Sequence, residues 1–138
     1  AWTAATCQSK GYLWFSLKDA SVLPSTLFWI ANKGRHDSPW NGRNRCLGLE
    51  EICGFFAEGL GGSSKPNVIN QAGFPTSIDL DASKPTTVNF IEGAVKIPAG
   101  FQNVKTADFG DKKVTFTSIT GKEVVVDVNY EFLNSGQL

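Results

Sequence analysis

The sequence contains no methionine and a single histidine, His36. Because position 1 is not methionine, we expect a processed or partial chain. The motifs of several enzyme classes are also missing: no P-loop, no GxGxxG after a strand, no HExxH and no GxSxG occurs. These absences argue against nucleotide hydrolysis, a dinucleotide cofactor, a zinc protease and an α/β-hydrolase.

Cysteine is scarce and odd in number, with Cys7, Cys46 and Cys53 as its only occurrences. Their spacings match neither a zinc site nor a CxxC pair, so we predict no metal and no cofactor. Cys46 and Cys53 stand among apolar neighbours and are expected to be small buried thiols. A cysteine nucleophile paired with His36 is the alternative. Unpaired cysteines are typical of a reducing compartment.

Net charge is absent as well, since 13 basic residues balance 13 acidic ones. No basic surplus favours nucleic acid or an anionic membrane. No apolar run reaches the roughly 18 residues of a membrane span, and the N-terminus lacks the pattern of a signal peptide. The sequence therefore predicts a cytoplasmic protein with no nucleic-acid or membrane partner. Its 138 residues predict one domain over residues 1–138.

What the sequence does contain is a series of short runs rich in strand-forming residues. Strands are predicted at Tyr12–Leu17, Thr26–Asn32 and Arg45–Glu51, and further strands in the C-terminal third. The clearest hairpin pairs 114–120 with 123–128 around Thr120-Gly121-Lys122. Residues 61–84 have the composition of a long ordered loop. We predict an all-β fold, a β-sandwich with at most one short helix near Phe55.

Polar chemistry is concentrated between Asn32 and Glu51. This segment holds all three arginines, the histidine, one tryptophan and two adjacent carboxylates. From Lys33 to Arg45, four basic residues accompany Asp37 as the one acid. The segment is the first place to look for a functional site. A charged surface loop followed by a buried strand is the alternative interpretation.

The order of LWFSL, LFWIANKG and GRxRCLGLEE, followed by PTTVNFIEGAVKIPAGFQNV and GKEVVVDV, resembles the C-terminal part of galactose mutarotase-like proteins, the aldose 1-epimerase superfamily. The resemblance implies part of a β-supersandwich with a sugar cleft across a concave sheet. In that family a strand like Cys46-Leu47-Gly48-Leu49-Glu50 delivers a carboxylate to the cleft. Because a supersandwich is usually about twice this length, the resemblance implies a fragment of a longer domain.

Interconversion of sugar anomers needs a base at the C1 hydroxyl and an acid at the ring oxygen. By resemblance Glu50 would be the base, while Glu51 should point to the opposite face of the strand. Family members take the acid from an upstream histidine, whereas His36 lies only fourteen positions before Glu50. Either His36 reaches the pocket from its loop, or the acid lies in a missing N-terminal portion, or the domain binds sugar without turnover. A lone loop histidine is more often a solvated surface group.

Sugar binding needs an aromatic face and side chains that take the hydroxyls. The substrate-binding candidates are Trp40, Asn41, Arg43 and Arg45. Trp40 lies in a turn, where secondary structure gives no reason for a large aromatic residue. Trp29 has a mid-strand position that favours core packing. The two arginines together could hold the phosphate of a sugar phosphate.

Two hypotheses remain. The first is a mutarotase-like enzyme acting on a hexose or sugar phosphate, in which Glu50→Gln abolishes turnover. The second is a noncatalytic sandwich that binds carbohydrate or a protein through the Trp40 and Arg43 loop, indifferent to the Glu50 charge. A glycosidase pair among the carboxylates stays open, since a sequence does not give their separation. An exposed strand edge makes a homodimer a further hypothesis.

Overall fold

The computed structural model describes residues 1–135 and consists mainly of antiparallel strands, which confirms the all-β prediction. The strands are β1 (Trp2–Cys7), β2 (Tyr12–Lys18), β3 (Ser25–Asn32), β4 (Arg45–Ile52), β5 (Phe90–Lys96), β6 (Val104–Gly110), β7 (Lys113–Ser118) and β8 (Glu123–Asp127). The strands β2, β3 and β4 each begin within one residue of the start predicted for them from the sequence. The chain is organised as two compact units, which we describe separately: unit 1 comprises residues 1–19 and 81–138, and unit 2 comprises residues 20–80.

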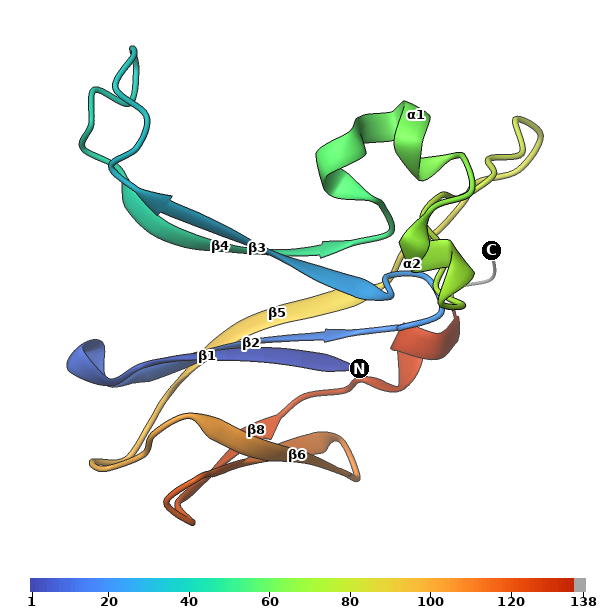
Figure 1. Cartoon of the computed structure of the whole chain (residues 1–138). Helices are drawn as coiled ribbons and strands as arrows, with labels where there is room; N and C mark the ends of the chain where they lie inside the picture. Colours follow the sequence, from blue (N-terminus) through green and yellow to red (C-terminus); the bar gives the residue numbers. More distant parts are fainter. Residues whose placement is uncertain (136–138) are drawn as a thin grey trace. The chain divides into compact units, whose positions relative to one another are not determined.

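Unit 1 is a small β-sandwich of two three-stranded sheets, ordered β1-β2-β5 and β6-β7-β8 (Figure 1). Its core lies between the sheets, where Phe15 of β2 packs on Phe116 of β7 with ring centroids 5.2 Å apart. The other members of the buried cluster are Leu13, Leu17, Phe101, Val114 and Leu133. The sequence placed Leu13, Phe15 and Leu17 on one face of the first strand, and this face is the one that the core buries.

Strand β1 was not predicted from the sequence. Its residues WTAATC are mostly small, so they form no run of bulky strand formers. The strand is nevertheless paired along its whole length with β2, from Trp2 opposite Leu17 to Cys7 opposite Tyr12. Its Trp2 ring packs against Phe116. Pairing with a neighbour therefore specifies this strand more than its own composition does.

The pairing of β2 with β5 explains how unit 2 is connected to unit 1. These strands form an antiparallel ladder in which Lys18 at the end of β2 lies opposite Phe90 at the start of β5. An antiparallel pair can be closed by a two-residue turn. Here the same connection runs through residues 19–89 and contains the whole of unit 2. Unit 2 is thus an insertion in a hairpin of unit 1.

Unit 2 begins with a regular hairpin of β3 and β4, drawn in Figure 1 with a looped tip. Side chains alternate between its two faces. One face carries Phe28, Ile30 and Leu47, with exposed fractions of 58%, 73% and 50%. The opposite face carries Trp29, which lies across from Gly48 in the register. This second face bears the candidate site.

The rest of unit 2 is made of single turns and loop. The 3₁₀ turn η2 (Phe56–Glu58) leads into α1 (Gly59–Ser63), and α2 (Val68–Gln71) follows. The sequence predicted at most one short helix, near Phe55, and an ordered loop over residues 61–84. Helix α1 begins four residues after Phe55, and α2 lies inside the predicted loop. Two further 3₁₀ turns, η1 (Gln8–Lys10) and η3 (Glu131–Ser135), belong to unit 1. In residues 1–135 no helix has the length and apolar character needed to cross a membrane.

Candidate functional site

The loop between β3 and β4 is held in place by its own backbone. The Lys33 amide donates to the Asn44 carbonyl at 2.8 Å, and the Gly42 amide donates to the Arg35 carbonyl at 2.8 Å. The amide of Trp40 donates to the Asp37 carbonyl at 2.9 Å. These bonds close the loop back on itself, so its side chains are presented by an ordered segment.

Arg35 lies against the rings of two tryptophans at the base of this loop. Its guanidinium carbon lies 5.0 Å from the ring centroid of Trp29 and 5.5 Å from that of Trp40. The two indoles meet edge to face, with centroids 6.2 Å apart and planes at 87°. Attraction between a guanidinium and an indole face contributes about 0.5–2 kcal/mol. The stack thus joins the looped tip to the strand that precedes it.

A depression of about 250 Å³ opens beside this stack and is lined by Trp29, Arg35, Glu50 and Phe56. Trp29 and Glu50 come from neighbouring positions on one face of the hairpin, because Glu50 is two residues from Gly48, the partner of Trp29. Phe56 comes from η2. Within the described residues the Glu50 carboxylate makes no hydrogen bond or ion pair, so its oxygens are available to a ligand.

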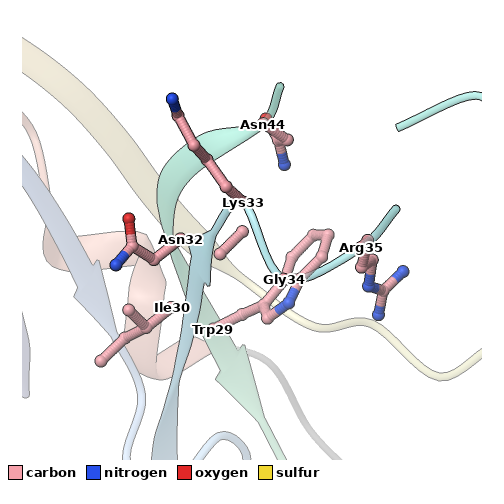
Figure 2. A pocket seen from close by; sticks show the side chains of 8 residues that line it. Trp29, Ile30, Asn32, Lys33, Gly34, Arg35 and Asn44 are labelled. Atoms are coloured by element: carbon pink, nitrogen blue, oxygen red, sulfur yellow. The ribbon is translucent and has the colours of Figure 1, made fainter. Parts of the chain in front are cut away.

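A second, smaller depression of about 90 Å³ lies where β3 runs into the loop (Figure 2). Trp29 and Arg35 line both depressions. In Figure 2 the Trp29 indole lies beside Arg35 on the right, while the side chains of Asn32 and Lys33 extend to the left. The lining of this second depression contains two cationic side chains, two amides and no carboxylate: Trp29, Ile30, Ala31, Asn32, Lys33, Gly34, Arg35 and Asn44.

Gly48 makes room for this arrangement. A Cβ atom at Gly48 would lie 3.3 Å from the Cβ of Trp29 and 3.5 Å from Oε1 of Glu50. The Trp29 side chain therefore fills the space that a side chain at position 48 would occupy.

The predicted site residues are only partly brought together. Trp40 contacts Arg35, as described, and Glu50 lines the larger depression. Asn41 is exposed at the turn, with φ of 48°. Arg43 and Arg45 are also exposed, the first in the loop and the second at the start of β4. None of these last three belongs to the lining of either depression.

His36 lies on the same loop but outside the lining of the Glu50 depression. It is exposed, and its Nδ1 would be 3.2 Å from a Cβ at Gly42, so the imidazole lies against the turn. The sequence alone leaves its role open between an acid that reaches the pocket and a solvated surface group. Its surroundings are those of a surface histidine.

Glu51 faces away from Glu50, as strand alternation predicted, and accepts a hydrogen bond of 2.7 Å from the Thr26 hydroxyl. The prediction of a buried Cys46 was wrong, because this thiol is exposed on β4. The apolar residues next to Cys46 in the sequence indicated burial. A two-stranded sheet, however, leaves one or both of its faces exposed to solvent. Cys53 is partly buried, and burial raises the pKa of its thiol.

Two residues of the larger depression, Trp29 and Phe56, were not predicted from the sequence to belong to the site. Core packing was expected for Trp29, but it is only partly buried and lies outside the hydrophobic core cluster. Phe56 was not singled out, since the dense apolar run ICGFFAEGL shows no period that would assign its faces. Only the turn that η2 makes after β4 places Phe56 beside the depression.

Among the described residues, no group of three or more His, Cys, Asp or Glu is arranged to hold a metal ion. No protein-family model, curated protein or solved structure matches the chain.

Proposed function

We propose that unit 2 binds carbohydrate, with one sugar residue seated in the depression lined by Trp29, Arg35, Glu50 and Phe56. The supporting observation is the meeting of two aromatic side chains, a carboxylate and a guanidinium around one opening. The volume of about 250 Å³ is below the roughly 300–1,000 Å³ typical of pockets for drug-sized ligands. We therefore expect a monosaccharide or the terminal residue of a glycan.

The chemistry of these side chains suits a sugar. The indole of Trp29 and the ring of Phe56 offer apolar surfaces for the C–H face of a pyranose. The Glu50 carboxylate accepts hydrogen bonds from sugar hydroxyls, and the Arg35 guanidinium donates to them. Hydrogen bonds that involve a charged partner are stronger than neutral ones, at about 1.5–3 kcal/mol each. Both charged groups thus contribute to affinity and orientation.

Binding without turnover is the better proposal than aldose 1-epimerase activity. Glu50 provides the base that the mutarotase resemblance requires. The remaining ionisable group of the lining is Arg35, and a guanidinium is a poor proton donor at neutral pH. A proton donor for the ring oxygen is therefore not among the lining residues, and His36 lies outside them. This arrangement supports the noncatalytic alternative.

Titration of the full chain with galactose and glucose by isothermal calorimetry tests the proposal. We expect saturable binding that weakens about tenfold in Glu50→Gln, because one charge-assisted hydrogen bond is lost. Trp40→Ala should also weaken binding, since the Trp40 ring supports Arg35 together with that of Trp29. Lys65→Gln is the matched control, an exposed charge of unit 2 outside both depressions.

Polarimetry of freshly dissolved α-glucose and α-galactose separates binding from catalysis. The proposal expects mutarotation at the rate of a protein-free blank. Acceleration by the wild type that Glu50→Gln abolishes would replace it with the epimerase function. Absence of saturable binding to either sugar, or equal affinities of Glu50→Gln and Lys65→Gln, would contradict carbohydrate binding in this depression.

A further inference from the structure

Positive charge is gathered on the β3–β4 loop although the whole chain is neutral. Lys33, Arg35, Arg43 and Arg45 are four cations, Asp37 is the one acid, and the segment 33–45 carries a charge of +3 with His36 neutral. All five side chains are exposed. Within residues 1–135 none of the four cations forms an ion pair. We define these four residues as the cationic loop.

Arg35 is the member of the cationic loop whose side chain is held in place by two tryptophan rings. Its guanidinium is held by the faces of Trp29 and Trp40, and no carboxylate neutralises it. Within residues 1–135 its N–H donors make no hydrogen bond or ion pair, so they are available to a ligand. These donors form a planar fork that matches the geometry of carboxylate, sulfate and phosphate oxygens.

The two depressions that share Arg35 differ in charge. The larger one contains the Glu50 carboxylate, which repels an anion. The smaller one has Lys33 and Arg35 in its lining, together with the amides of Asn32 and Asn44, and no acidic side chain. A ligand that spans both would therefore place its neutral ring beside Glu50 and an anionic substituent beside Lys33 and Arg35 in the smaller depression.

We infer that the ligand is an anionic carbohydrate, a sugar that bears a carboxylate, sulfate ester or phosphate ester. The inference rests on the proposed function, because it assigns the ring to the Glu50 depression. The inference adds the position of the oxyanion, which lies in the smaller depression beside Arg35 and Lys33. Arg43 and Arg45 add to the positive potential of the loop and attract such a ligand over roughly one Debye length.

The test compares neutral and anionic partners at the same site. The full chain is titrated with galactose, galacturonate, glucose, glucose 6-sulfate, glucose 6-phosphate and inorganic phosphate, at low and at 0.5 M sodium chloride. We expect at least one anionic sugar to bind about tenfold more tightly than its neutral parent at low salt. The advantage should shrink at high salt, because screening weakens interactions between exposed charges.

Variants locate the effect. Arg35→Gln should remove most of the preference for the anionic sugar and leave part of the affinity for the neutral one. The double variant Arg43→Gln/Arg45→Gln removes two charges from exposed positions outside the stack, so it keeps the fold intact and should reduce the preference about threefold. Lys65→Gln is the control and should preserve it. Circular dichroism checks that each variant is folded.

The outcomes separate this inference from the proposed function. If neutral sugars bind and no anionic sugar binds more tightly, carbohydrate binding stands and the anionic class is wrong. Inorganic phosphate that binds as tightly as the best anionic sugar would also overturn the inference, because the ring would then contribute nothing. If none of the sugars binds, the proposed function itself fails.

Discussion

Phe15 lies over Gly93 in unit 1, at the cross-strand position opposite it in the β2–β5 register. A Cβ atom at Gly93 would lie 2.6 Å from Cζ of Phe15, well inside van der Waals contact. An aromatic ring that covers a facing glycine is a device that stabilises sheets. Because Phe15 also contacts Phe116 in the core, the ring has little freedom to move aside.

Gly93→Ala should therefore overpack the core of unit 1 and lower the free energy of unfolding by about 1–3 kcal/mol. Gly61→Ala is the contrasting variant, since no atom lies within 4 Å of its added Cβ and Gly61 is helical in α1. Alanine is favoured over glycine in a helix by up to about 1 kcal/mol. Thermal unfolding followed by circular dichroism measures both. A Gly93→Ala protein as stable as the wild type would contradict this close packing of Phe15 over Gly93.

Cys46, which lies in β4, and Cys53, which directly follows this strand, should differ in reactivity. Burial raises the pKa of Cys53, so a smaller fraction of its thiol is ionised at a given pH. Cys46 is exposed. Alkylation with iodoacetamide at pH 8, followed by peptide mass spectrometry, should modify Cys46 first, and Cys46→Ser and Cys53→Ser identify the peptides. Faster modification of Cys53 would contradict its partial burial.

The same shift in pKa has a consequence for stability. A thiol with a raised pKa in the folded state binds its proton more tightly there than in the unfolded chain. As pH rises through the unfolded and then the folded pKa, the Cys53 thiol therefore makes folding less favourable. Wild type should lose more stability than Cys53→Ser on going from neutral to alkaline pH, as measured by urea unfolding.

At the level of elements, the turn around α2 depends on one buried amide. The side chain of Asn67 accepts hydrogen bonds from the amides of Ile69 and Asn70 at 3.0 and 3.1 Å. Its Nδ2 donates to the Thr76 hydroxyl at 2.9 Å, and that hydroxyl donates to the Ser63 carbonyl at 2.6 Å. The amide thus caps α2 and ties it to the end of α1 and to the chain that follows.

Asn67→Ala should reduce the stability of unit 2 by about 2 kcal/mol, because it removes a helix cap and leaves buried partners unsatisfied. Urea unfolding followed by tryptophan fluorescence measures the change. Ser64→Ala is the control: Ser64 is exposed and makes a single side-chain bond of 3.5 Å to Gly61, so its loss should cost less than about 0.5 kcal/mol. Equal effects of the two substitutions would contradict a central role for Asn67.

At the level of the whole molecule, the hydrophobic core belongs to a discontinuous part of the chain. Every member of the buried cluster lies in residues 1–19 or 81–138, while unit 2 is inserted between two paired strands. Lys18 and Phe90 lie opposite one another, so a short link could replace the connection between them. Unit 1 should then keep its fold without unit 2.

We expect a chain that joins Asp19 to Asn89 through an Asn-Gly link to unfold cooperatively, with a native near-ultraviolet circular dichroism signal. The shorter connection also reduces the entropy cost of closing the β2–β5 ladder by about 2 kcal/mol. The matched protein carries the link together with Gly93→Ala and should be less stable. Loss of the cooperative transition in the linked chain would show that unit 1 requires residues 20–88.

The sequence by itself determined most of the local structure. The runs of strand formers predicted β2, β3 and β4 closely, and the alternation of the first run assigned Leu13, Phe15 and Leu17 to the buried face. These features depend on neighbours within a few residues, which a single sequence displays. The small residues of β1 lacked that signal, because their strand is specified by its partner.

The tertiary structure alone decided which side chains meet. Trp29 and Glu50 share a depression because the β3–β4 register places Gly48 between them, and Arg35 joins because the loop folds back on the strand. Periodicity assigns a residue to a face but does not name its partner on the next strand. The sequence thus pointed to the segment with the polar chemistry. The register then brought Trp29 and Glu50 together, and the folding back of the loop added Arg35.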